Sequence, residues 1–195
     1  MNPILCAVME GNFFSTSKSR DCVITAANTA GDVFLKALTA CEDQVPALES
    51  FLRRMTTVKD DESSQKALRE EITKHGDAFS TKYLALLDGG DSPYKIGQKV
   101  FEAASKNKAD LKRPEVAEAY NQAIIRFKAG DVKQKMDEVV KKFSGLNDSV
   151  RNAEDKLSGV GTERHKTLDV IRSLYLFVQR RLNNLEAAIT TLARG

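Results

Sequence analysis

The fold of this chain is decided by residues 132–192, which contain VKQKMDEVVKKFSGLNDSVRNAEDKL (132–157) and LDVIRSLYLFVQRRLNNLEAAITTL (168–192). Apolar or small residues recur in both halves at alternating spacings of four and three. They are Val132, Met136, Val139, Phe143, Leu146, Val150, Ala153 and Leu157, then Leu168, Ile171, Tyr175, Val178, Leu182, Leu185, Ile189 and Leu192. This recurrence is typical of helices that pack along a coiled-coil seam. Because Gly159-Val160-Gly161 separates the halves, the sequence predicts an antiparallel helical hairpin over about 132–158 and 163–193.

The two edges of this hairpin differ in charge. Folding at the corner pairs apolar residues whose numbers sum to about 321, such as Val150 with Ile171. One edge then carries complementary charges, with Glu154 near His165. The opposite edge carries Lys135, Lys142, Lys156, Leu174, Arg181 and Ala188, with no acid among them. We therefore expect a cover for that edge: another helix of this chain, a second copy, or phosphate groups of a membrane or nucleic acid.

Residues 174–178 form an uninterrupted apolar run, Leu-Tyr-Leu-Phe-Val. A helix with a single buried stripe does not need five consecutive apolar residues, so this helix is expected to be buried on more than one side. It is interpreted as the central helix of a bundle or as an oligomer seam. The candidate partner or oligomer interface consists of Leu174, Tyr175, Phe177, Val178 and Arg181.

The remaining sequence predicts more helices. A third heptad run extends from Ile24 to Met55, and its phase continues across Pro46, which favours one kinked helix over about 20–57 rather than two helices. Asp60 or Asp61 can cap a helix over 62–87. We predict an all-α fold, an elongated antiparallel bundle of long, partly kinked helices in a single domain. Its parts are an N-terminal cap or flexible segment (1–19), kinked helices (20–88), middle helices (93–129) and the C-terminal hairpin (131–195).

Composition restricts the class of protein. The 195 residues carry a net charge of +3, far from the dense positive field of a dedicated nucleic-acid binder. The three Cys show no CxxC or metal-ligand spacing, and an odd number without a pattern fits a reducing compartment. No apolar run approaches the roughly 20 residues that span a bilayer. We expect a cytoplasmic protein, with the membrane surface as the alternative location.

No motif predicts catalysis. The sequence lacks GxSxG and a phosphate-binding loop, and His75 and His165 have no Cys or His partners at metal-ligand spacing. Its carboxylates occur in clusters such as Asp60-Asp61-Glu62, which are typical of solvated surface. We expect a non-enzymatic protein with no catalytic residue, cofactor or metal.

Two functions remain, and they belong to different classes. The first is a structural or adaptor protein that binds itself, as a homodimer, or another helical protein. The second is a membrane-surface binder, because long kinked helices would allow a helical dimer with an architecture like that of BAR domains; no residue motif assigns the chain to that family. The apolar segment 3–14 could pack over the bundle or insert into a membrane. The candidate lipid-binding residues are Arg126, Lys128, Lys133, Lys135, Lys141 and Lys142, although an acidic helix could bind them instead. Nucleic acid is an unlikely partner.

Overall fold

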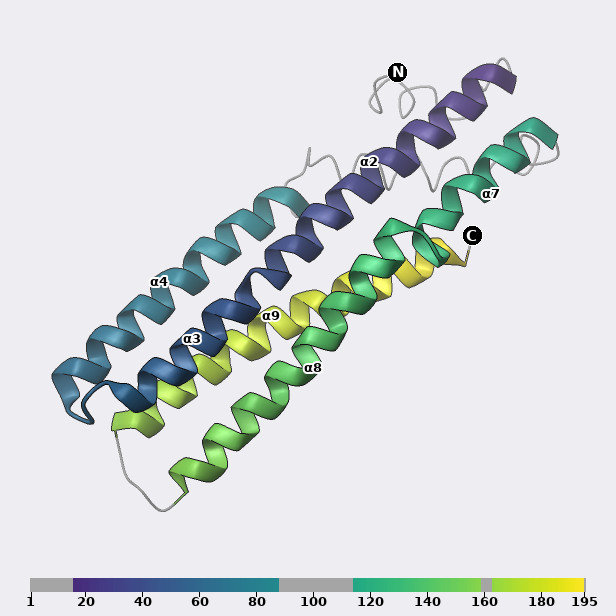
Figure 1. The fold of residues 1–195 in the computed structure, drawn as a ribbon. Helices are drawn as coiled ribbons and strands as arrows, with labels where there is room; N and C mark the ends of the chain where they lie inside the picture. Colours follow the sequence, from purple (N-terminus) through teal and green to yellow (C-terminus); the bar gives the residue numbers. More distant parts are fainter. Residues whose placement is uncertain (1–15, 88–113, 159–162, 195) are drawn as a thin grey trace. The chain divides into compact units, whose positions relative to one another are not determined.

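The structure is a computed structural model that describes residues 16–87, 114–158 and 163–194 (Figure 1). The helices are α2 (Thr16–Glu42), α3 (Gln44–Thr57), α4 (Glu62–Leu87), α7 (Pro114–Lys128), α8 (Asp131–Leu157) and α9 (Glu163–Ala193). The described ranges contain no strand, and the prediction of an all-α helical bundle is confirmed. The expectations for residues 1–15, for 88–113 and for the corner at 159–161 lie outside the described residues.

The chain divides into two compact units. Of the described residues, 16–37, 83–87, 114–136 and 185–194 form the first unit, and 38–82, 137–158 and 163–184 form the second. Helices α2, α4, α8 and α9 contribute residues to both units.

The second unit is built from α3, most of α4, the end of α2 and the adjoining parts of α8 and α9. Tyr175 of α9 stacks on Phe143 of α8, with ring centroids 6.1 Å apart, and Arg172 pairs with Glu154 at 3.0 Å. Because higher numbers on α8 meet lower numbers on α9, the two helices are antiparallel, as predicted. Glu154 was expected near His165, but its ion pair is with Arg172. The predicted seam residue Ala153 is half-buried. The other seam residues of this unit are buried: Val139, Phe143, Leu146, Val150, Leu157, Leu168, Ile171, Tyr175, Val178 and Leu182.

Helix α4 covers a second side of α9. The ring of Phe79 meets that of Phe177 edge to face, with centroids 6.0 Å apart, and Leu174 lies against Gly76. The open edge of the hairpin was expected to be covered by another helix, a second copy or phosphate groups. In the structure, α4 of the same chain covers it. This accounts for the five consecutive apolar residues, since α9 is buried against both α8 and α4.

The prediction of one continuous helix over 20–57 is wrong. Helix α2 ends at Glu42 and α3 begins at Gln44, although Asp43 keeps helical dihedrals (φ −60°, ψ −20°). Pro46 has no N–H to donate to the Glu42 carbonyl, and its ring crowds that carbonyl, so the helical hydrogen-bond ladder is interrupted there. The heptad pattern nevertheless continues in α3, where Val45, Leu48, Leu52 and Met55 are buried.

The first unit contains α7 together with the adjoining parts of α2, α8 and α9. Phe127 of α7 contacts Phe34 of α2 edge to face, with centroids 5.9 Å apart. Helix α7 ends at Lys128, where the Gly130 N–H donates to the Ile125 carbonyl at 2.8 Å. Helix α8 then begins at Asp131, so a turn separates α7 from α8.

Candidate functional surfaces

A groove of about 280 Å³ lies between α4 and α9 on the outside of the second unit. Its floor is apolar, whereas small side chains leave its centre unfilled, notably Gly76 and Ser80 of α4 and Ser173 of α9. We call it the outer groove. Its residues are Ile72, Thr73, Gly76, Asp77, Ser80, Val170, Ser173, Leu174 and Phe177.

The structure separates the predicted interface residues into two groups. Tyr175 and Val178 belong to the buried seam. Leu174 is 8% exposed but forms part of the floor of the outer groove. Phe177 is half-buried in the same groove, and the Arg181 guanidinium lies 5.0 Å from the centroid of its ring. Of these five residues, the ones that a partner can reach therefore lie on the side of α9 that faces the groove.

Leu176 is the residue that sequence reasoning missed. It is 51% exposed and stands in the middle of the apolar run, on the outer face of α9. Asp169, Ser173 and Arg180 are also exposed, and together with Leu176 they recur along this face at spacings of four, three and four. The available signal was the offset of Leu176 from the heptad seam, because a large apolar residue off the seam faces solvent or a partner.

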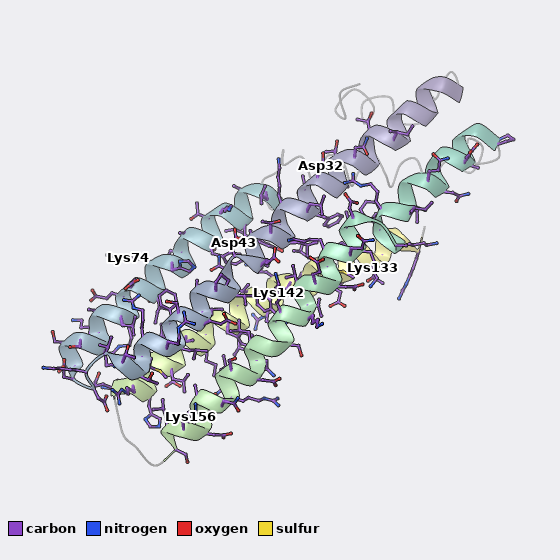
Figure 2. All side chains as sticks on the ribbon, in the orientation of Figure 1. Asp32, Asp43, Lys74, Lys133, Lys142 and Lys156 are labelled. Carbon is purple, nitrogen blue, oxygen red and sulfur yellow. The ribbon has the colours of Figure 1, made fainter. Side chains whose placement is uncertain are left out.

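A second groove, of about 530 Å³, lies between α3 and α8. Its lining includes the short side chains of Thr56, Ser149 and Ala153, which leave space between the two helices. Its rim carries charges of both signs, Glu49, Arg53 and Lys156, the last near the C-terminal end of α8 (Figure 2).

Arg126, one of the predicted lipid-binding residues, is held by acids of the first unit. Its guanidinium pairs with Asp131 at 2.9 Å and with Asp32 at 3.4 Å. It also lies against Gly31, where an added Cβ would be 2.5 Å from its Cζ. The hydrogen bond from Arg126 holds the pKa of Asp131 below its ordinary value.

The other basic residues differ in their surroundings. In the second unit Lys142 pairs with Glu42, which raises the pKa of Lys142 (Figure 2). Lys133 and Lys135 are half-buried and have interaction partners, whereas Lys128 and Lys141 are exposed. The acids that pair with Arg126 and Lys142 come from α2 and from the start of α8.

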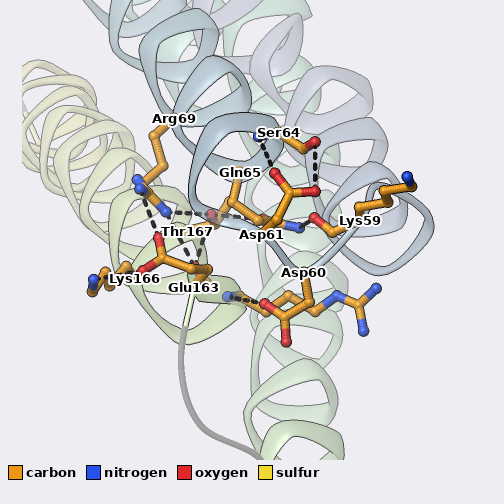
Figure 3. Close-up of polar contacts among 10 residues, drawn as sticks. Lys59, Asp60, Asp61, Ser64, Gln65, Arg69, Glu163, Lys166 and Thr167 are labelled. Atoms are coloured by element: carbon orange, nitrogen blue, oxygen red, sulfur yellow. Dashed lines mark hydrogen bonds and ion pairs between the residues drawn. The ribbon is translucent and has the colours of Figure 1, made fainter.

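A polar cluster joins α3, α4 and α9 at one end of the second unit (Figure 3). Asp61 caps α4, because its Oδ1 accepts a 2.7 Å hydrogen bond from the Ser64 N–H. Asp60 instead accepts the Arg164 N–H at 3.2 Å, in the first turn of α9. Adjacent aspartates thus cap two helices that lie about a hundred residues apart in the sequence.

The last carbonyls of α3 are satisfied by side chains from the other two helices. Gln65 is fully buried, and its Nε2 lies 3.1 Å from the Met55 carbonyl and 3.2 Å from that of Lys59. Its Oε1 accepts from the Thr167 hydroxyl at 2.8 Å. The Arg164 guanidinium donates to the carbonyls of Met55, Thr56 and Val58.

An ion pair completes this cluster. Arg69 of α4 pairs with Glu163 of α9 at 3.0 Å, and Lys166 pairs with the same carboxylate at 2.7 Å. Lys166 and Arg69 together hold the pKa of Glu163 below its ordinary value. Each polar group of the cluster serves a helix end or a neighbouring helix, so the arrangement fixes the helices in place.

The histidines and the buried thiol are dispersed. His75 Nε2 lies 2.7 Å from Gln44 Oε1, and its ring meets Phe51 edge to face. His165 is half-buried, and none of the described residues forms a hydrogen bond with its Nδ1. Burial raises the pKa of Cys41 to about 12. Among the described residues, no group of three or more His, Cys, Asp or Glu side chains is placed to hold a metal ion.

Within the described ranges, no helix is both long enough and apolar enough to cross a bilayer. Comparison of the chain with protein-family models, with curated proteins and with solved structures gave no match.

Proposed function

We propose that this protein is a non-enzymatic adaptor that acts through helix–helix contacts and associates with itself. The observation that carries the proposal is the outer groove, with the half-exposed Leu176 beside it on α9. An apolar groove between two helices is the kind of surface that receives an amphipathic helix. The free, buried thiol of Cys41 fits the proposed cytoplasmic location.

Sedimentation velocity at micromolar concentrations tests this proposal. The wild-type protein is expected to sediment as a dimer, and Leu176→Glu is expected to give a folded monomer, because the substitution places a charge on the contact surface. Leu174→Glu and Val178→Glu are unsuitable for this purpose, since both side chains are buried and a charge there would unfold the unit.

Ile125→Glu is the matched control. Ile125 is 55% exposed on α7, so the chemical change is the same on a different surface. It is expected to leave the sedimentation coefficient unchanged. If the wild type is a monomer over the whole concentration range, the proposed self-association is wrong. If both variants lose the dimer equally, the dimer contact is not specific to the surface around Leu176.

The alternative function, binding to an anionic membrane surface, has weaker support. Lys128 and Lys141 are exposed and could meet lipid phosphates, but Arg126 and Lys142 already pair with acids of the same chain. An ion pair must be broken before either of these two can contact a phosphate.

A further inference from the structure

The outer face of α9 carries a pattern of charges that is complementary to itself. Asp169, Ser173, Leu176 and Arg180 recur at spacings of four, three and four, which places them in a stripe about 60° wide on a helix of 3.6 residues per turn. All four are exposed. Within the described part of the chain, the Asp169 carboxylate and the Arg180 guanidinium have no ion-pair or hydrogen-bond partner.

We infer that this face binds the same face of a second copy, with the two α9 helices antiparallel. Each facing pair of residue numbers then sums to 349. Asp169 lies opposite Arg180 of the second copy, and Ser173 lies opposite Leu176 of the second copy. A twofold axis between these layers makes each contact twice, as an isologous dimer requires.

The charges select this orientation. In a parallel pair, the two Asp169 carboxylates would face each other, and so would the two Arg180 guanidinium groups. Like charges that face each other across an interface are unfavourable, whereas the antiparallel pair makes two attractive contacts. Exposed ion pairs add little affinity, so they set the register and the apolar contacts supply the affinity.

The outer groove supplies those apolar contacts. Ser173 lines the groove, so Leu176 of the second copy, opposite Ser173, enters it beside Phe177. The small Gly76 and Ser80 leave space for that side chain. A long aliphatic side chain on one copy and a hollow beside it on the other complete the self-complementary surface.

This inference rests on the proposed self-association, and a charge exchange tests it separately. Asp169→Arg alone and Arg180→Asp alone are each expected to weaken the dimer about tenfold, because each replaces two attractive pairs by two repulsive ones. An equimolar mixture of the two variants is expected to form a heterodimer, since the arginine at 169 meets the aspartate at 180. The double variant Asp169→Arg/Arg180→Asp is expected to dimerise like the wild type.

Two exposed residues of α8 provide the matched control. Asp155→Arg and Lys141→Asp reverse the same charges away from this face, and neither is expected to change the dimer. Sedimentation velocity and native mass spectrometry of the mixtures give the readout. If the wild type dimerises but the single variants and their mixture behave like it, the register is wrong and self-association stands. If the wild type is a monomer throughout, both the register and the self-association fail.

Discussion

Gln65 is a polar residue at the centre of the corner where α3, α4 and α9 meet. Its side chain is fully buried and bonds to main-chain carbonyls of the α3–α4 connection and to Thr167 of α9. Burial of an amide is tolerated only where its hydrogen bonds are made, and here both of its ends are satisfied. In the sequence, Gln65 lies between Ser64 and Lys66 and looks like any other surface residue.

Replacing Gln65 is therefore expected to destabilise the protein. Gln65→Leu should lower the free energy of unfolding by about 2 kcal/mol, because the Lys59 carbonyl and the Thr167 hydroxyl each lose a partner. At neutral pH, Gln65→Glu should lower the free energy of unfolding more than Gln65→Leu does, because a carboxylate would face the carbonyls of Met55 and Lys59. Those carbonyls would raise the pKa of the new carboxyl in the folded state. The Gln65→Glu protein should therefore lose further stability as pH rises above about 4.3.

Urea denaturation measures both changes. Lys66→Leu and Lys66→Glu are the controls, because Lys66 is exposed on the next position of the same helix, and each should stay within about 0.5 kcal/mol of the wild type. A Gln65→Leu protein as stable as the wild type would show that this corner is held by Arg164 and the ion pairs alone.

At the scale of the element, the interruption between α2 and α3 has a defined cause and a defined consequence. Pro46 removes the main-chain hydrogen bond to the Glu42 carbonyl. At the start of α3, the side chain of Gln44 donates to the Ala40 carbonyl at 3.3 Å. Gln44 is buried in this position and binds His75 of α4. The break therefore supplies a polar anchor between α3 and α4.

Pro46→Ala is expected to join α2 and α3 into one helix. The new N–H can bond to the Glu42 carbonyl, so the free energy of unfolding should rise by about 1–2 kcal/mol, after allowance for the greater freedom of the unfolded chain. Circular dichroism during thermal unfolding gives the measurement. Pro46→Gly is the control and should be about 1 kcal/mol less stable than Pro46→Ala, because it restores the N–H without the helix propensity of alanine. Lower stability in Pro46→Ala than in the wild type would contradict this account.

At the scale of the whole molecule, several charged side chains form ion pairs within the chain. The net charge is only +3, and acids that are distant in sequence bind members of the basic run: Asp32 binds Arg126, and Glu42 binds Lys142. The membrane alternative therefore depends on exposed lysines such as Lys128 and Lys141.

Neighbouring lysines allow a sharp test of that alternative. If the protein binds anionic lipid, sedimentation with phosphatidylserine vesicles should fall with added salt. Lys141→Gln should reduce it more than Lys142→Gln, because Lys141 is free to meet a phosphate and Lys142 is held by Glu42. Both substitutions remove one positive charge, so each is the control for the other. Equal effects would assign the binding to net charge alone, and absence of sedimentation at low salt would end the membrane alternative.

The sequence by itself determined the helices and their buried faces. Spacings of four and three predicted the seam of α8 and α9, and Asp61 was correctly placed as a possible cap of α4. These features are local, because a helix satisfies its own backbone and its apolar stripe follows from 3.6 residues per turn. Pro46 shows where local reasoning was insufficient: a continuous heptad phase concealed a single missing hydrogen bond.

Only the tertiary structure decided which surfaces are covered and which stay open. The apolar run of α9 predicted burial on two sides, but the packing of α4 left Leu176 and the outer groove accessible. In the same way, Asp60 caps α9 although it precedes α4 in the sequence. Such contacts join residues that are distant along the chain, and they depend on the order in which the helices pack, which periodicity within one helix cannot specify.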